Sequence, residues 1–316
     1  MDFFKRHISW FAASATAALL AGGYFFAIAP PPTFPAGNII VIARGASVSD
    51  IAEELSDAHI IAHPDLLRFV LRISGTGGSV QAGAYRFQAP QNLFTVAARL
   101  ITGAYGLPPV RLTFPEGMTV REMASKIADA FPEVKAEDFL KEAQPYEGYL
   151  FPDTYLFPPS FDAAYVVALM RANFNTRTAA IRNRQASSSL SDIVILASLI
   201  EKEARTTAVR RMIAGILWNR LRLGMPLQVD AVFGYIFDRD TYSPSLADLE
   251  VDSPYNTYAH TGLPPGPICN PGLESIQAAL HPAKTDYLYY LTDKNGVMHY
   301  STTYAGHQAN RKKYLN

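Results

Sequence analysis

The sequence predicts an α+β fold in which a membrane-anchored N-terminus precedes a small strand–helix module and a larger mixed domain with a central buried helix. Three observations predict this fold. Residues 8–29 carry no charged side chain, residues 45–58 and 117–130 share one strand–turn–helix pattern, and residues 193–200 form an uncharged run with helical character. With 316 residues, the chain has room for two domains, each with its own core.

Composition excludes several classes of protein. Of the residues, 49% are hydrophobic and 18% are charged, as in an ordinary folded protein, and the formal net charge is zero. The chain therefore has no overall basic field to attract nucleic acid, and no nucleic-acid partner is expected. Cys269 is the single cysteine, and the seven histidines show no HxH or HExxH spacing. We therefore expect no intrachain disulfide, no metal site and no cofactor.

The N-terminal segment predicts where the protein is located. Residues 8–29 are numerous enough to cross a bilayer as one helix. A cleaved signal peptide is the alternative, because residues 27–29 resemble a cleavage site, but the stretch is longer than usual and prolines follow at once. Lys5 and Arg6 precede the span, which predicts that residues 1–7 are a cytoplasmic tail. The protein is thus expected in the cytoplasmic (inner) membrane as a single-pass protein, with its later domains on the periplasmic side.

A proline-rich linker, PPPTFPAG at residues 30–37, precedes a first domain that we expect at residues 38–105. In both copies of the repeated pattern, residues 45–58 and 117–130, a predicted strand is followed by a glycine. A hydroxyl residue then caps a short amphipathic helix. The first copy resembles a LysM module, and residues 110–130 form a second LysM-like strand and helix. LysM modules bind glycans that contain N-acetylglucosamine, so the resemblance implies glycan binding. A module that only scaffolds, and two unrelated strand–helix units, remain the alternatives.

The second domain is expected at residues 106–316. Hydrophobic spacing predicts helices at residues 161–184, from near residue 192 onward and at 208–223, and a hairpin of residues 287–291 with 297–301. Asn270 and Pro271 are predicted to be the N-cap and first residue of a helix that ends at Leu280. Residues 253–272 hold five prolines and three glycines, and a long irregular segment in a compact domain typically lines a site.

Two glutamates, Glu201 and Glu203, end the apolar helix. Residues two apart lie about 200° apart around a helix, so only one of them can face a given cleft. Glu201 lies above small side chains that leave room for a ligand, whereas Glu203 lies above bulky ones: the former are Val194, Ala197 and Ser198, and the latter are Leu196, Leu199 and Ile200. A carboxyl partly buried beside apolar groups remains a proton donor near neutral pH. The pattern therefore predicts that Glu201 is the catalytic acid.

Glu203 is correspondingly predicted to be a structural partner for Arg205, Arg210 or Asn219. The alternative is that both glutamates are solvated charges at a helix end. One acid suffices for chemistry if a hydroxyl of a sugar attacks the anomeric carbon of the same sugar. The acid then protonates the leaving oxygen and afterwards accepts the proton of that hydroxyl. Other candidates for the same cleft are Gln228, Asp230, Tyr255, Asn256, Tyr258 and Glu147 as substrate contacts, with Asp153 as structural support.

Five motifs together resemble the YceG-like family of endolytic murein transglycosylases. They are EGYLFPDTY (147–155), LASLIEKEA (196–204), NRLRLGMPLQVD (219–230), SPYNTYAHTGLPPGPICNPG (253–272) and HPAKTDYLYYL (281–291). The resemblance implies a lyase that cleaves the MurNAc–GlcNAc bond of nascent peptidoglycan strands and leaves 1,6-anhydro-MurNAc ends. It also implies that the first glutamate of the E-K-E motif, here Glu201, is catalytic, and that cell-wall synthases are partners. The chain departs from the family where Ala231-Val232 follow Asp230, since the family commonly has Pro-Thr there.

Two other functions are compatible with parts of the sequence. One is a non-catalytic envelope scaffold that binds glycan through the LysM-like unit. The other is a pyridoxal-phosphate-dependent aminodeoxychorismate lyase, which needs a cytosolic substrate and a Schiff-base lysine. The predicted anchor at residues 8–29 argues against a cytosolic substrate, and no lysine has a distinctive setting.

Overall fold

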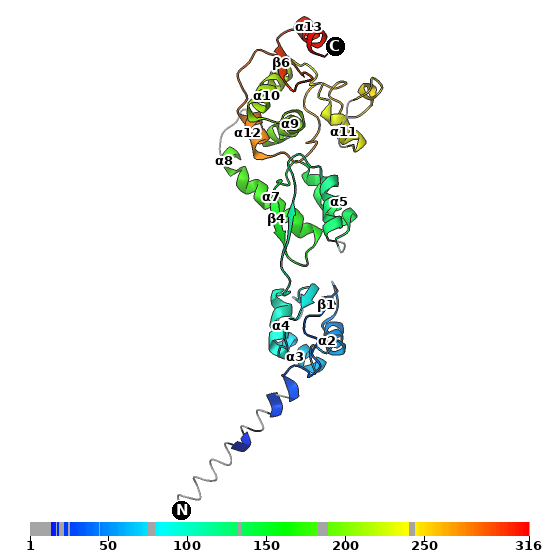
Figure 1. The fold of residues 1–316 in the computed structure, drawn as a ribbon, viewed down its shortest axis with the longest axis vertical. Helices are drawn as coiled ribbons and strands as arrows, with labels where there is room; N and C mark the ends of the chain where they lie inside the picture. The colour runs from blue at the N-terminus through cyan, green and yellow to red at the C-terminus, as the bar shows by residue number, and fades with distance from the viewer. Residues whose placement is uncertain are drawn as a thin grey trace, which may run out of the picture. The chain divides into compact units, whose positions relative to one another are not determined.

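The computed structural model describes residues 14–16, 18, 22–24, 26–43, 45–74, 80–131, 134–182, 189–239 and 244–315. The chain forms two compact units, and each is described by itself (Figure 1). Unit 1 comprises Met1–Val110 with Leu156–Phe161, and unit 2 comprises Arg111–Tyr155 with Asp162–Asn316. Helices combine with three two-stranded sheets in the described part of the chain, which confirms the α+β class.

The predicted cytoplasmic tail, residues 1–7, lies outside the described residues, as does much of the predicted span at 8–29. Among the residues that are described, we find no helix whose length and apolar character would let it cross a membrane. The membrane anchor therefore stays a prediction.

Unit 1 is built on a short antiparallel sheet covered by helices. Strand β1 (Ile39–Ile42) pairs with β2 (Gly83–Arg86), with Ile40 opposite Tyr85. The helices are α2 (Val48–Asp57), α3 (Pro64–Ile73) and α4 (Leu93–Thr102). Their apolar faces meet in one core, which includes Leu55, Leu67, Leu71, Tyr85, Phe87 and Leu100.

The repeated sequence pattern corresponds to a repeated local structure. In unit 1, Gly45 adopts a φ of +78° and Ser47 forms a capping box with Asp50 at the start of α2. In unit 2, Gly117 adopts a φ of +82° and Thr119 forms a capping box with Glu122 at the start of α5 (Val120–Ala130). Glycine tolerates this left-handed backbone, and the reciprocal cap satisfies two amide groups that the helix leaves free. Strand β3 (Val110–Thr113) precedes the second copy.

Unit 2 continues with elements that lead to the central helix. They are α6 (Ala136–Ala143), the 3-10 helix η1 (Gln144–Tyr146), β4 (Thr154–Phe157), α7 (Ala163–Arg177) and α8 (Ala179–Arg182). Helix α7 covers most of the helix predicted at 161–184. Strand β4 pairs with β3, and the hydroxyl groups of Thr113 and Thr154 are hydrogen-bonded at 2.8 Å.

Helix α9 (Leu190–Glu203) is the centre of unit 2, which confirms the predicted buried helix. Its N-cap is Ser189, which forms a capping box with Asp192, so the helix begins two residues before the predicted start. All residues from Ile193 to Ile200 are buried. Figure 1 shows α9 among α10 (Thr207–Arg222), α11 (Ala231–Phe237) and α12 (Leu273–Leu280), and all three contact it.

The C-terminal part differs from the prediction at one helix start. Helix α12 has Gly272 as its N-cap, two residues beyond the predicted N-cap Asn270, because the side chain of Asn270 is used elsewhere. The predicted hairpin is confirmed as β5 (Tyr289–Thr292) and β6 (Met298–Ser301). The 3-10 helix η2 (Asp248–Glu250) and helix α13 (Tyr304–Tyr314) were not predicted.

Candidate active site

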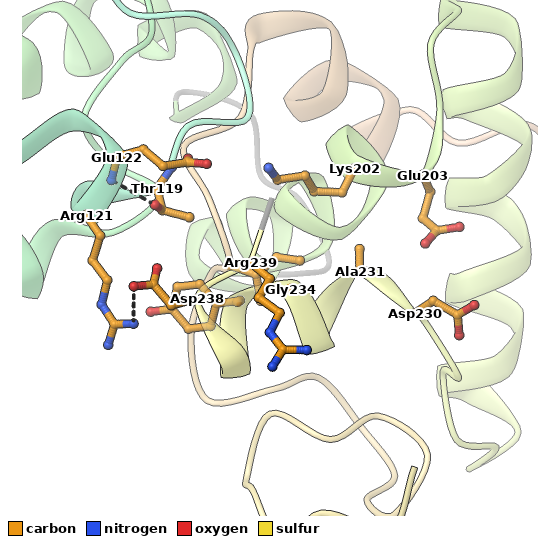
Figure 2. A pocket seen from close by; sticks show the side chains of 12 residues that line it. Thr119, Arg121, Glu122, Lys202, Glu203, Asp230, Ala231, Gly234, Asp238 and Arg239 are labelled. Atoms are coloured by element: carbon orange, nitrogen blue, oxygen red, sulfur yellow. Dashed lines mark hydrogen bonds and ion pairs between the residues drawn. The ribbon is translucent and has the colours of Figure 1, made fainter. Parts of the chain in front are cut away.

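A pocket of about 410 Å³ lies in unit 2, between the start of α5, the end of α9 and α11. Figure 2 shows Arg121 and Glu122 of α5 on one side and Glu203 with Asp230 on the other, and Lys202, Asp238 and Arg239 lie between these two groups. The lining residues are Thr119, Arg121, Glu122, Lys202, Glu203, Asp230, Ala231, Gly234, Tyr235, Asp238, Arg239 and Ile268. The pocket therefore contains one of the two glutamates that end the central helix, and it is Glu203.

Glu203 has the properties of a proton donor. Burial raises its pKa from the ordinary value of 4.5 to about 7, and the negative charge of Asp230 acts in the same direction. The hydroxyl of Tyr290 donates to Oε2 of Glu203 at 3.0 Å, which partly opposes the rise in pKa. A carboxyl with this pKa is partly protonated at neutral pH, which is the condition for general acid catalysis.

Glu201 is held in a different environment. Its side chain is 6% exposed, and its Oε1 lies 2.8 Å from Nη2 of Arg210. Its Oε2 accepts a hydrogen bond from the backbone N–H of Gly272 at 2.9 Å, at the N-terminus of α12, where a helix favours negative charge. Both carboxylate oxygens of Glu201 are thus engaged inside the protein, and Glu201 is not among the residues that line the pocket.

The pocket lining thus includes Glu203 and not Glu201, opposite to the predicted phase, while Glu203 is itself largely buried, and which of the two glutamates faces the substrate stays a prediction. Small side chains on α9 do leave space, but residues 268–272 of the same chain fill it. The N–H of Ile268 donates to Oγ of Ser198 at 3.0 Å, and the thiol of Cys269 donates to the carbonyl of Ser198 at 3.4 Å. The catalytic role predicted for Glu201 is a separate matter, which only activity can decide.

The partners predicted for Glu203 also differ from those observed. Arg210 binds Glu201 and, through Nη1, Oε2 of Glu274 at 2.9 Å. The amide of Asn219 donates to the backbone carbonyls of Thr285 and Tyr287. Glu203 instead accepts hydrogen bonds from the hydroxyl of Tyr290 and from the backbone N–H of Ala231.

Asp230 is exposed on the pocket and is bound by Tyr258, whose hydroxyl donates to Oδ1. Burial, together with Asp230, raises the pKa of Tyr258, so this hydroxyl remains protonated. Tyr255 lies against the pocket-lining Tyr235, with ring centroids 5.0 Å apart. Gln228 is exposed beside this group with a φ of +51°, and its N–H donates to the carbonyl of Thr257 at 3.0 Å. The structure thus gathers four of the predicted contacts near one another.

Arg220 holds this group to the β5–β6 hairpin. It is 5% exposed, and its Nε donates to the carbonyl of Leu288 at 2.6 Å. Its Nη1 donates to the carbonyls of Leu227 at 2.8 Å and Pro226 at 3.2 Å. One guanidinium group therefore ties the segment that carries Asp230 to the strand that carries Tyr290. No sequence pattern singles out Arg220, because it is one of several basic residues along its helix.

Two predicted substrate contacts are structural in the observed fold. Asn256 is fully buried, and its amide donates to the carbonyls of Leu249 at 3.0 Å and Val251 at 2.9 Å while its Oδ1 accepts from Tyr258 N–H. It therefore shapes the loop from within and is not available to substrate. These contacts are local to the loop, which explains why the sequence could not distinguish them from ligand contacts.

Glu147 is likewise occupied. Its side chain accepts the N–H of Val120 at the start of α5 and the side-chain amide of Asn270 at 2.9 Å. It is 7% exposed, and burial raises its pKa to about 7. Asp153 pairs with Arg177 at 2.9 Å and, like Glu147, is not among the pocket-lining residues. Both side chains support the fold, and Glu147 does so directly beside the pocket, because Val120 lies between the lining residues Thr119 and Arg121.

The described residues contain no group of three or more histidine, cysteine, aspartate or glutamate side chains that could hold a metal ion. Cys269 is buried, and burial raises the pKa of its thiol, so it is not a reactive nucleophile. The chemistry available in the pocket is therefore that of carboxyl, hydroxyl and cationic side chains.

Comparison with known proteins gives consistent matches over most of the chain. The profile of the YceG-like family matches residues 40–313. The endolytic murein transglycosylase of Bacillus subtilis (strain 168) is 34% identical, over 88% of this chain and 84% of the relative. A protein of the same name from Streptococcus pneumoniae serotype 2 is 28% identical, over 87% of this chain and 58% of that protein. A crystal structure of a yceG-like protein from Listeria monocytogenes matches with a TM-score of 0.59 and 32% identity, over 86% of this chain and 98% of that one.

Proposed function

The chain belongs to the YceG-like family, and from this membership together with the pocket around Glu203 we propose that it is an endolytic murein transglycosylase, a lyase that acts on peptidoglycan. The proposal is carried by one observation: Glu203 lines the pocket, and its carboxyl group has a pKa of about 7. A scaffold that only binds glycan needs no such group, so the site favours the enzyme over that alternative.

We infer that Glu203 performs both proton transfers. As an acid, it gives its proton to the glycosidic oxygen as the bond from C1 of MurNAc to that oxygen breaks. The C6 hydroxyl of the same MurNAc attacks C1 to form the 1,6-anhydro ring, and the Glu203 carboxylate takes the hydroxyl proton. The acid is regenerated, no water is consumed, and the other product carries a free C4 hydroxyl on GlcNAc.

Glu203 is the better candidate for this acid, although the family motif predicts Glu201. The oxygens of Glu201 are engaged by Arg210 and by Gly272, whereas Glu203 lines the pocket. Asp230 is the next carboxyl group, but it is held as the hydrogen-bond acceptor of the Tyr258 hydroxyl and is not placed to donate a proton. Substitution of each glutamate in turn distinguishes the roles of Glu201 and Glu203.

Substrate contacts are proposed for the exposed and partly exposed polar and aromatic side chains beside this pocket. Tyr255 and Tyr258 can stack on sugar rings, and Gln228 and Asp230 can accept or donate hydrogen bonds at sugar hydroxyl groups. These four residues belong to two loops that the Gln228–Thr257 backbone hydrogen bond holds together. A glycan strand bound across these loops would place its reacting sugar beside Glu203.

The domain organisation is proposed to follow the sequence. It comprises a cytoplasmic tail (1–7), a transmembrane anchor (8–29), a linker (30–37), a LysM-like domain (38–105) and the YceG-like catalytic domain (106–316). The apolar N-terminal sequence supports the anchor, and the shared glycine and capping box of α2 and α5 support a LysM-like duplication. We propose peptidoglycan strands as the substrate, the periplasmic side of the inner membrane as the location of the catalytic domain, and cell-wall synthases as partners.

Mass analysis of the digestion products tests the proposed reaction. Purified full-length protein in detergent is incubated with uncrosslinked glycan strands, and the new ends are identified. We expect 1,6-anhydro-MurNAc ends, which are lighter by one water than reducing ends. New reducing ends would show that water attacks C1, which would make the protein a hydrolase. Binding without any new ends would favour the scaffold.

A further inference from the structure

The end of the apolar N-terminal sequence, residues 8–29, is fixed to unit 1. The carbonyl of Phe26 accepts a hydrogen bond from Nε2 of His63 at 2.6 Å, and the carbonyl of Ile28 accepts one from the N–H of Leu93 at 3.0 Å. His63 is the N-cap of α3, and Leu93 is the first residue of α4. Carbonyl groups that a helix leaves unpaired at its end are thus bound by the starts of two helices of unit 1.

The residues that follow form a short, fixed connection. Phe34 packs against the core of unit 1, and its ring meets the ring of Phe87 edge-on with the centroids 6.2 Å apart. The N–H of Gly37 donates to the carbonyl of Phe87 at 2.7 Å. The proline-rich residues 30–37 are therefore not a flexible tether, because unit 1 binds both their aromatic ring and their last amide group.

Apolar side chains are exposed on α3 and α4 beside this connection. Phe69 and Ile73 are four residues apart on α3 and so share one face of this helix, and Phe94 follows Leu93 at the start of α4. Phe26, Phe69, Ile73 and Phe94, the apolar surface of unit 1, are each more than half exposed. Figure 1 shows α3 at the end of unit 1 where the N-terminal residues enter, whereas β1 lies toward the opposite end.

We propose that the apolar surface of unit 1 lies on the lipid bilayer and inserts its side chains among the lipid headgroups. This inference rests on the proposed anchor at residues 8–29 and adds a second, peripheral membrane contact to it. Amphipathic helices at a membrane surface bury their apolar face about 5–10 Å into the boundary between headgroups and acyl chains. Because a fixed connection joins this surface to the end of the span, lipid is the partner that is always within its reach.

The chemistry of this surface also favours lipid over glycan. Sugar hydroxyl groups need hydrogen-bonding partners, and phenylalanine and isoleucine side chains supply none. Arg72 is exposed between Phe69 and Ile73, where its charged group can reach lipid phosphates while its stem lies along apolar groups. Asp65, the acidic residue in the first turn of α3, is paired with Arg68 at 2.6 Å and so does not present an unpaired negative charge to the headgroups.

The test uses the full-length protein in liposomes with one fluorescent label at a time. Cys269 is the single cysteine and is buried, so a thiol-reactive fluorophore reports an introduced cysteine alone. The labelled variants are Phe69→Cys and Phe94→Cys, and the matched control is Val41→Cys, at an exposed apolar residue of β1. Each label is quenched in turn by a lipid that carries a nitroxide near its headgroup and by iodide in the buffer.

We expect the nitroxide lipid to remove most of the fluorescence at positions 69 and 94 and to leave position 41 bright, with the reverse pattern for iodide. Equal quenching of all three labels by iodide, in protein that still floats with the liposomes, would overturn the inference and leave the anchor in place. Shielding of positions 69 and 94 by added glycan strands and not by lipid would assign the surface to glycan and would also overturn it.

Protein that does not float with the liposomes would contradict the proposed anchor, and the inference with it. The reaction on peptidoglycan is decided separately by the ends of its products, so a failure of the proposed activity is distinguishable from each of these outcomes.

Discussion

Glu201 and Arg210 form an ion pair of 2.8 Å at the end of α9, and this pair turns Glu201 away from the pocket that the neighbouring Glu203 lines. Two carboxyl groups of one motif thus have different surroundings. Glu201 is paired with the buried guanidinium of Arg210 and with the N-terminus of α12. Burial raises the pKa of Glu203. On this difference we base the proposal that Glu203 transfers protons and that Glu201 supports the fold.

Replacement of Glu203 by glutamine should abolish most of the activity. Glutamine keeps the size of the side chain and can still accept from Tyr290, but it has no proton to transfer. We expect kcat to fall on the order of 10²–10⁴-fold, as measured by release of anhydro ends from glycan. The circular dichroism spectrum should match that of the wild type. Wild-type turnover by Glu203→Gln would return the role of acid to Glu201.

Replacement of Glu201 by glutamine should act mainly on stability. Removal of one partner of a buried ion pair leaves the other charge uncompensated, which costs about 3–5 kcal/mol in general. Because Glu274 remains beside Arg210, we expect the lower end, about 3 kcal/mol, measured by denaturant unfolding. Glu274→Gln is the matched control, since it removes a more exposed partner of the same arginine, and it should lower the unfolding temperature much less. If Glu201→Gln is fully stable yet inactive, the assignment of roles to the two glutamates is reversed.

Replacement of Asp230 by asparagine should shift the pH profile downward. The charge of Asp230 raises the pKa of Glu203, so its removal lowers that pKa. The protonated acid is then lost at a lower pH, and the alkaline limb of kcat moves toward acid. Asp238→Asn also removes a carboxylate of the pocket, but Asp238 pairs with Arg121 and is not a cause of the raised pKa. An equal shift in both variants would contradict a specific effect of Asp230.

Glu147 should make stability depend on pH. Its pKa rises from 4.5 to about 7 on folding, so between these values the folded chain binds more protons than the unfolded chain. Its stabilising contribution is present below about pH 4.5 and is lost as the pH rises through about 7. The pKa of Glu203 is also raised by burial, so its contribution to the stability of the fold is likewise lost as the pH rises. We expect the unfolding temperature to fall over this range in the wild type and to fall less steeply in Glu147→Gln. An unchanged slope would show that Glu147 is ionised in the folded protein.

Local sequence patterns predicted the local structure well. The uncharged run Ile193–Ile200 predicted a buried α9, and the spacing of residues 287–291 and 297–301 predicted the hairpin. Which of the two glutamates lines the pocket could not be predicted. The size of the neighbouring side chains on one helix does not reveal which other segment packs against them. Here residues 268–272 fill the side that seemed open. Tyr290 and Arg220 were missed for the same reason, since their roles depend on contacts between distant segments.

Arg220 has a consequence for the order in which the protein matures. It is a buried cation with no carboxylate partner among the described residues, and its donors are satisfied by carbonyl groups of residues 226, 227 and 288. These carbonyls come together only when the chain on both sides of α12 has folded, and the same step brings Tyr290 to Glu203. A chain that is truncated before Leu288 therefore lacks both the carbonyl that anchors Arg220 and the hydroxyl that contacts Glu203, so the surroundings of this carboxyl are complete only when nearly the whole of unit 2 has been synthesised.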